Sequence, residues 1–357
     1  MTLSLCDLPE DILCEISKRL PTTDDVLSLQ TTHPKISSKI NRTFWRSPKC
    51  LCLSADGEII IPHLIFDETK QMTFSRPTWP RLLAVLTKVK NLKELVLGDC
   101  GKYFSEEILF QALIFLQKSK EIKLQKILAF YQNPDKFFKK NDEQKKDVWP
   151  TKGIHNQLCK LVEKSGKSLL FLLLCLNNSD EFVSISRNSI SDSNIQIQYC
   201  HQPTFESRYA VFYPFLNGFA KGCTEIKSLS IRIKMIPSMA NIMLDHCVQC
   251  CVPAHSESLL EHISVTFTAM HEKEEKNSAE KTKVTGFENF QNAGNLKSLV
   301  WFFDVSLPEE KVEKLCCPVG GDCPYDIFVQ TPEMKKIYPG VPANVSLNPP
   351  KLLQCIS

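Results

Sequence analysis

The segment richest in metal-binding and nucleophilic side chains runs from His246 to His255. It contains a Cys-x2-Cys pair, Cys247 and Cys250, with a histidine at each end. Thiolates and imidazoles are the ligands that Zn²⁺ takes in structural sites. However, the adjacent thiols of Cys250 and Cys251 fit a tetrahedral site poorly, and no second Cys-x2-Cys or His-x3-5-His pair stands at the usual distance. A cysteine-rich loop is therefore favoured, with a zinc-dependent binding module kept as an alternative. Further thiols that could complete a site are Cys316, Cys317 and Cys323.

Motifs typical of enzyme active sites are absent from the sequence. It contains no nucleophile elbow, phosphate-binding glycine loop, His-Glu-x2-His pair or Asp-x-Asp metal loop. Gly320-Gly321-Asp322 lacks the strand and helix that a phosphate site requires on either side. His262 falls within a predicted strand, where a packed core histidine is expected in place of a general base. We therefore expect a non-catalytic protein that needs no cofactor or metal.

The composition is that of a soluble globular chain of about two domains. Its 357 residues are 43% hydrophobic and 23% charged, which allows a sizeable core. The net charge of +3 is too small to attract nucleic acid or a membrane surface at long range, so neither partner is expected. The longest apolar run, Leu169 to Leu176, is far shorter than the ~20 residues that cross a bilayer. The N-terminus lacks the basic region of a secretory signal and the 16 cysteines are scattered, so we expect free thiols and a cytoplasmic and/or nuclear protein.

A short amphipathic helix is predicted immediately after Leu8. Pro9 suits the first turn of a helix because its φ is already helical, and the acidic pair Glu10-Asp11 opposes the positive end of the helix dipole. The aliphatic residues that follow recur at helical spacing: Ile12, Leu13, Ile16 and Leu20. Pro21 ends the element.

Two further short helices are predicted before Trp45. Thr22 or Thr23 can cap the first of them, and Pro34 can begin the second. Their apolar residues are Val26, Leu27 and Leu29 in the first, then Ile36 and Ile40 in the second, with Phe44 and Trp45 closing the segment. Three short helices are too few to bury all of these groups, so a partner is expected.

This N-terminal segment resembles the F-box family. The matching positions are Leu8-Pro9, Ile12-Leu13, Ile16, Leu20-Pro21, Asp24, Leu27, Leu29 and Trp45. Members of the family pack three helices on a Skp adaptor, which links them to a cullin scaffold and a RING subunit. The resemblance implies that Trp45 packs inside the motif. It also implies an adaptor-binding surface made of Leu8, Pro9, Ile12, Ile16, Leu20, Leu27 and Leu29. Thr31-Thr32-His33-Pro34 departs from the family pattern at the junction of the second and third helices.

A repeated strand pattern occupies much of the remaining chain. After two short predicted strands, Cys50–Leu53 and Glu58–Ile61, an aliphatic pattern recurs in segments spaced by about 30 residues or more. These segments are Asn91–Leu97, Glu121–Leu124, Glu225–Ile231, Ser258–Val265 and Asn295–Trp301, in which Ile122 matches Leu92. Helices are predicted between strands at Ser105–Leu116, His155–Val162 and Phe212–Phe219. A strand and a helix per repeat is the unit of a leucine-rich-repeat solenoid, so the chain resembles F-box proteins with such repeats. An α/β domain without a true repeat is the alternative.

The expected fold is therefore α/β, with a small three-helix F-box followed by an irregular leucine-rich-repeat-like solenoid. We expect an F-box domain at 5–48, a substrate-binding repeat domain at 49–315 and a proline-containing C-terminal cap or extension at 316–357. Two charged stretches, Asp135–Lys152 and His271–Lys283, are expected to be solvated loops.

The function that follows is that of a substrate-recognition subunit of an SCF-type (Skp-cullin-F-box) E3 ubiquitin ligase. Such a subunit binds the Skp adaptor, and through it a cullin, and positions a protein substrate without bond chemistry of its own. The sequence does not identify the substrate or its binding residues. The alternatives are an F-box and repeat interaction protein with a non-ligase role, and the zinc-dependent binding module.

Overall fold

The chain forms an α/β protein of two compact units, which confirms the expected α/β class. The computed structural model describes residues 4–53, 63–67, 70–74, 78–98, 105–132, 149–176, 181–200, 212, 214–220, 226–235, 261–269, 298–304 and 327–329. The first unit comprises residues 1–180, 188–190 and 207–224, and the second comprises 181–187, 191–206 and 225–357. Among the described helices, none has the length and apolar character needed to cross a membrane.

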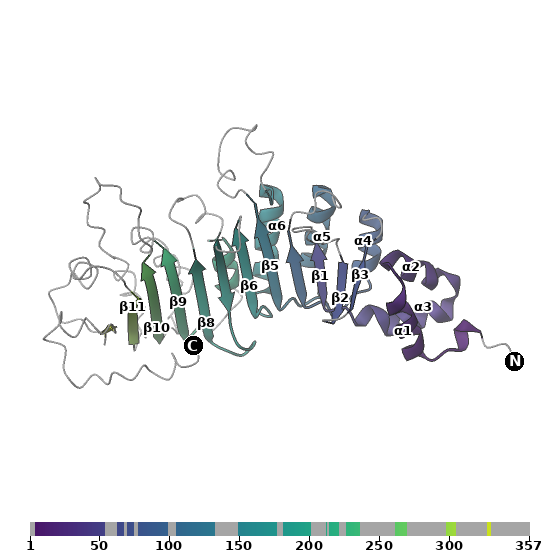
Figure 1. The fold of residues 1–357 in the computed structure, drawn as a ribbon, viewed down its shortest axis with the longest axis horizontal. Helices are drawn as coiled ribbons and strands as arrows, with labels where there is room; N and C mark the ends of the chain where they lie inside the picture. The colour runs from purple at the N-terminus through teal and green to yellow at the C-terminus, as the bar shows by residue number, and fades with distance from the viewer. Residues whose placement is uncertain are drawn as a thin grey trace, which may run out of the picture. The chain divides into compact units, whose positions relative to one another are not determined.

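Residues 5–46 fold as three short α-helices flanked by two 3-10 turns (Figure 1). The elements are η1 Leu5–Asp7, α1 Glu10–Arg19, α2 Thr23–Thr32, α3 Pro34–Arg42 and η2 Phe44–Arg46. Thr22 caps α2, because its hydroxyl accepts the N–H of Asp25 while the Asp25 carboxylate accepts the N–H of Thr22 at 3.0 Å. Pro34 begins α3, and the ring of His33 accepts the N–H of Lys35 at 3.1 Å. The junction that departs from the F-box pattern is therefore a well-capped helix boundary.

The aliphatic residues on the inner sides of these helices form a small core. The hydrophobic side chains with at most 2% exposure are Leu13, Val26, Ile36, Ile40, Phe44 and Trp45. The rings of Phe44 and Trp45 meet edge to face, with centroids 4.8 Å apart. The indole N–H of Trp45 donates to Gln30 Oε1 at 2.9 Å, and Gln30 Nε2 donates to Asn41 Oδ1 at 2.8 Å. Trp45 thus lies inside the three-helix segment, as expected.

The sheet of the first unit contains six strands in the order β6-β5-β4-β1-β2-β3. Their bounds are β1 Cys50–Leu53, β2 His63–Asp67, β3 Lys70–Thr73, β4 Glu94–Leu97, β5 Lys126–Tyr131 and β6 Phe171–Leu176. Strands β1, β4, β5 and β6 run parallel, whereas β2 is antiparallel to both β1 and β3. The crossovers between parallel strands contain α4 Trp79–Leu86, α5 Glu106–Lys118 and α6 Lys152–Ser165. Figure 1 shows these helices side by side along one face of the sheet.

The helices predicted between strands are confirmed. Ser105 caps α5 by accepting the N–H of Ile108 at 3.4 Å, α6 contains the predicted His155–Val162, and the described residues of Phe212–Phe219 are helical. A side chain of α6 satisfies the end of α5, because Lys164 Nζ donates to the carbonyls of Leu116 at 2.7 Å and Ser119 at 2.5 Å.

The parallel strands of the first unit repeat one arrangement. Leu95, Ile127 and Leu172 are cross-strand partners, and each follows a buried leucine three residues earlier: Leu92, Leu124 and Leu169. Before each strand one carbonyl accepts two successive N–H groups. Lys49 O accepts those of Lys93 and Glu94, and Lys93 O accepts those of Gln125 and Lys126. The strand predicted at Glu121–Leu124 is therefore wrong. The strand β5 starts at Lys126, and the residue equivalent to Leu92 is Leu124 and not Ile122.

The three-helix segment packs on the start of this sheet. Phe44 contacts Phe66 of β2, with ring centroids 5.0 Å apart. Arg81 of α4 donates to the Asp24 carboxylate at 3.0 Å, and Thr22 forms an isolated β-bridge with Thr73 at the end of β3. These contacts place the first helices and the first repeat in one compact unit.

The second unit has its own strands in the order β12-β11-β10-β9-β8-β7. They are β7 Glu181–Ser186, β8 Asn194–Cys200, β9 Ser228–Met235, β10 His262–Ala269, β11 Ser298–Asp304 and β12 Ile327–Val329. All neighbours are parallel except β7 and β8, and Leu229, Ile263 and Leu299 are cross-strand partners. The predicted strand patterns at Glu225–Ile231, Ser258–Val265 and Asn295–Trp301 thus lead into β9, β10 and β11. The predicted strand Glu58–Ile61, the loop His271–Lys283 and most of Asp135–Lys152 lie outside the described residues.

Candidate adaptor-docking surface

None of the seven side chains predicted to bind an adaptor is buried. Ile12 is 45% exposed and Pro9 is also exposed. The other five are partly exposed, namely Leu8, Ile16, Leu20, Leu27 and Leu29. Their neighbours Leu13 and Val26 are fully buried. The helices therefore carry one aliphatic side that forms their core and further aliphatic residues that do not.

Partly or fully exposed aliphatic residues form a short stripe on α1. Ile12 and Ile16 are four residues apart, so they lie one above the other along the helix, and Leu20 follows as the C-cap residue. Leu13 and Ser17 form the buried stripe, about 100° further round the helix. Leu5, which is 41% exposed, precedes this stripe in η1. Covering the exposed part of these side chains would stabilise the protein, because removing apolar surface from water is favourable.

The two leucines of α2 do not share one face of that helix. At about 100° per residue, Leu27 and Leu29 stand about 200° apart, on the two flanks of the buried residues. Leu27 falls on the flank of Asp24, which is the residue that binds Arg81 of α4. Leu29 lies on the other flank.

Two side chains of α3 fix the turn that carries Leu8 and Pro9. Lys39 Nζ donates to the carbonyls of Cys6 at 2.9 Å and Leu8 at 2.6 Å, and Arg42 pairs with Glu10 at 2.5 Å. Lys39 thus holds the backbone that carries Leu8 and Pro9. No pattern in the sequence indicates this role.

We expect Lys39→Met to loosen this turn and to lower the free energy of unfolding by about 1–2 kcal/mol, because it removes two hydrogen bonds from a charged donor at a partly exposed site. Hydrogen exchange measures the local effect. The amides of Asp7 and Leu8, which donate to Ser4 O and Leu5 O, should exchange at least tenfold faster. Lys35→Met is the matched control, because Lys35 is exposed on the same helix. Equal exchange rates in both variants would contradict the positioning role.

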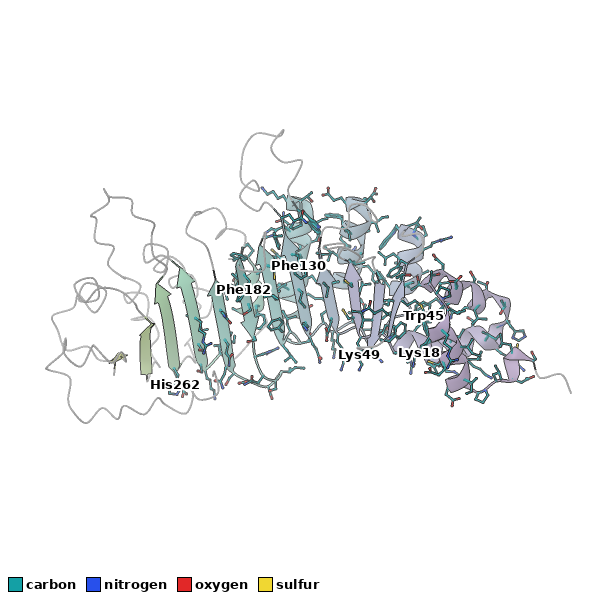
Figure 2. All side chains as sticks on the ribbon, viewed as in Figure 1. Lys18, Trp45, Lys49, Phe130, Phe182 and His262 are labelled. Carbon is teal, nitrogen blue, oxygen red and sulfur yellow. The ribbon has the colours of Figure 1, made fainter. Side chains whose placement is uncertain are left out.

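A second open apolar surface lies on the sheet face that the helices leave uncovered. Tyr131 of β5 points to α6, since its hydroxyl is 3.0 Å from His155 Nδ1, so the alternate residues Leu128 and Phe130 point the other way. Val96, Leu128 and Leu173 form a cross-strand row, beside the pair Phe130 and Cys175, and all are partly exposed. Phe130 is labelled on the sheet in Figure 2. Sequence reasoning missed this row. Its signal was the apolar character of both faces of β5 and β6, which is typical of strands covered on both sides.

A polar cluster in the first unit joins the buried Tyr131 and His155 with the partly exposed Cys159. Cys159 Sγ is 3.5 Å from His155 Nε2, opposite the Tyr131 contact, and the ring of Phe215 packs edge-on against His155 at 5.2 Å. Burial lowers the pKa of His155 to about 4 and raises the pKa of Cys159 to about 12. At neutral pH the histidine is therefore uncharged and the cysteine is a thiol, which is a poor nucleophile. The cluster fills the core and does not form an activated dyad.

The remaining chemical candidates give no site among the described residues. His262 begins β10 with a side chain 41% exposed and 3.8 Å from the Glu261 carboxylate, so the expectation of a packed core histidine is wrong. The zinc candidates between His246 and His255, with Cys316, Cys317 and Cys323, lie outside the described residues, as does Gly320-Gly321-Asp322. Within the described part, no three His, Cys, Asp or Glu side chains gather to hold a metal, and the six cysteines whose side chains are described are free thiols.

Comparisons with known proteins do not assign a function to this surface. No protein-family model matches the chain, and no curated protein matches it. A functional proposal therefore rests on the residues and their geometry.

Proposed function

We propose that the chain is the substrate-recognition subunit of an SCF-type E3 ubiquitin ligase, with residues 5–48 as the F-box domain that binds a Skp adaptor. One observation on α1 carries the proposal: Leu13 is fully buried, whereas Ile12 is exposed and Ile16 and the C-cap residue Leu20 are partly exposed, at the positions where F-box proteins bind the adaptor. Open aliphatic stripes on a helix are typical of protein interfaces. The capped junction at His33-Pro34 supports the proposal too, because it keeps the three-helix arrangement despite an unusual sequence.

In this proposal the rest of the chain holds a protein substrate. Residues 49–315 form an irregular leucine-rich-repeat-like domain, supported by the in-register aliphatic residues Leu95, Ile127 and Leu172 of β4, β5 and β6, and 316–357 form a C-terminal cap or extension. The open row Val96, Leu128 and Leu173 offers an apolar surface for the substrate. Binding raises the effective concentration of substrate lysines near the ubiquitin-conjugating enzyme, which carries out the transfer in the cytoplasm or nucleus.

Co-purification with a Skp adaptor tests the docking step. Ile12→Asp/Ile16→Asp should weaken binding at least 100-fold, because it forces carboxylates into an apolar interface. The variant should still fold, since neither side chain belongs to the core, and circular dichroism checks this. Ile190→Asp is the matched control: Ile190 is 53% exposed outside the three-helix segment, and this variant should bind like the wild type. A well-folded wild-type chain that fails to bind any Skp adaptor would contradict the proposal.

Ubiquitin transfer separates the ligase role from a non-ligase interaction role. The chain should be assembled with adaptor, cullin and RING subunits, and its captured partners tested as acceptors. Transfer to a captured partner supports the ligase. A stable complex that never modifies a bound partner favours the interaction protein.

A further inference from the structure

The edge of the first unit's sheet at which its parallel strands begin is strongly basic. Four segments meet there: residues 46–49, 88–94, 118–126 and 163–167, called here the basic edge. They contain eleven lysine or arginine residues and three glutamates, a net charge of +8, whereas the whole chain has only +3. Figure 2 labels Lys49 at this edge. The rest of the chain is thus net acidic, and the positive charge is concentrated on one side of the first unit.

Part of this charge has a structural role. Lys164 binds the last carbonyls of α5, as described above. Lys90 pairs with Glu121 at 3.3 Å, and Lys126 lies 3.8 Å from Glu94. A lysine in the last turn of a helix also opposes the helix dipole, but that effect fades beyond the last turn.

Five lysines of the basic edge have no bonded partner among the described residues. All are exposed, and their side chains form no hydrogen bond or ion pair there: Lys49, Lys93, Lys118, Lys120 and Lys123. Lys49 and Lys93 precede neighbouring strands that are in register, with Cys50 opposite Glu94. Like charges at opposing positions destabilise a sheet. An acidic ligand would turn this unfavourable arrangement into a favourable one.

We propose that the basic edge binds an extended acidic segment of a partner protein. Neighbouring strands lie about 4.8 Å apart, so the starts of β1, β4, β5 and β6 span roughly 15 Å. An extended chain rises about 3.3 Å per residue, so about five residues cover this edge and alternate side chains face the lysines. A short run of alternating Asp or Glu therefore matches the surface in length, spacing and charge.

The side chains of the basic edge favour carboxylates over nucleic acid. Ten of the eleven basic residues are lysines, and only Arg46 has the planar fork that binds phosphate with two parallel hydrogen bonds. Binding of single-stranded nucleic acid also uses open aromatic rings for stacking. Two aromatic rings beside this edge are not open for stacking. Trp45 is buried, and Lys126 Nζ lies 5.9 Å from the ring centroid of Phe171. The basic edge shares no residue with the adaptor-docking surface, so either can fail without the other.

Fluorescence anisotropy of the full chain with a labelled decapeptide of alternating Glu and Ser tests the basic edge. We expect saturable binding at 50 mM salt that weakens at least tenfold at 200 mM, because exposed charges are screened. Lys93→Glu/Lys123→Glu should weaken binding at least tenfold further. Lys35→Glu/Lys152→Glu is the matched control, since it makes the same change in net charge at exposed lysines away from this edge, and it should change binding less than twofold.

Three results would overturn the assignment. The first is absence of saturable binding, or equal binding of a decapeptide of alternating Gln and Ser. The second is an equal loss in both double variants, which would mean that net charge alone attracts the peptide. The third is a ten-nucleotide oligothymidine that binds more tightly than the acidic peptide through the same two lysines, which would assign the basic edge to nucleic acid. Circular dichroism of each variant ensures that all comparisons are made on folded protein.

Discussion

Trp45→Ala should lower the free energy of unfolding by about 3–5 kcal/mol, the usual cost of removing a large buried aromatic ring. The indole has no exposed surface and packs edge to face against Phe44. Its N–H donates to Gln30, so the substitution also leaves a largely buried amide oxygen without its donor. Urea unfolding followed by circular dichroism measures the loss, and the three-helix segment should unfold first.

Two controls separate packing from hydrogen bonding. Trp79 begins α4 and is partly exposed, so Trp79→Ala should cost less than half as much as Trp45→Ala. Trp45→Phe keeps most of the ring but removes the N–H, and it should cost about 1–3 kcal/mol. Equal costs for the two alanine variants would mean that Trp45 does not close the core of this segment. Adaptor binding should be lost in Trp45→Ala through unfolding, whereas Ile12→Asp/Ile16→Asp should lose it while staying folded.

Helix boundaries were predictable because local chemistry fixes them. Either Thr22 or Thr23 could cap α2 from sequence alone. The structure selects Thr22, because Asp25 then stands three residues later and returns a hydrogen bond. With Thr23 as the cap the third residue would be Val26, which has no polar group to return. Pro34 and Ser105 act in the same local way, and both predicted starts are confirmed.

The phase of the strands was less predictable because it depends on distant partners. Ile122 and Leu124 alternate like strand residues, but the true repeat places Leu124 before Ile127 and Ala129, where a small alanine hides the pattern. Only the pairing of Leu95 with Ile127 shows that Leu124, and not Ile122, is equivalent to Leu92. Leu169–Leu176 contains the strand β6, but a run that is apolar on both faces fits a buried helix as well as a strand, so its sequence alone does not predict which of the two it forms.

The candidate sites show the same limit. The F-box resemblance predicts that both Leu27 and Leu29 of α2 belong to one adaptor-binding surface. Two residues that are two positions apart in a helix cannot face the same way, so only the helix geometry shows that they do not share one face. Val96, Leu128 and Leu173 come from three different strands, so no single segment of the sequence predicts this row. The basic edge was hidden by the balanced charge of the whole chain, since its lysines come from turns that only parallel stacking brings together.

Acidification should destabilise the first unit through His155. Its side chain is 4% exposed between β5 and α6, and burial lowers its pKa from the ordinary value near 6.5 to about 4. Protonation therefore favours the unfolded chain. The stability is complete above about pH 6.5 and is lost as the pH falls toward 4, by about 3 kcal/mol in all. Between pH 7.5 and pH 5 the loss from this one group should be about 2 kcal/mol.

The pH dependence of urea unfolding measures this contribution. His155→Gln cannot titrate but still offers an oxygen to the Tyr131 hydroxyl, so its stability should fall by about 2 kcal/mol less than that of the wild type between pH 7.5 and pH 5. The carboxylates are common to both proteins and cancel in the comparison. If His155→Gln and the wild type lose stability in parallel, His155 is not held as a buried neutral imidazole, and the packing of α6 against β5 must be looser than the distances to Tyr131 and Cys159 indicate.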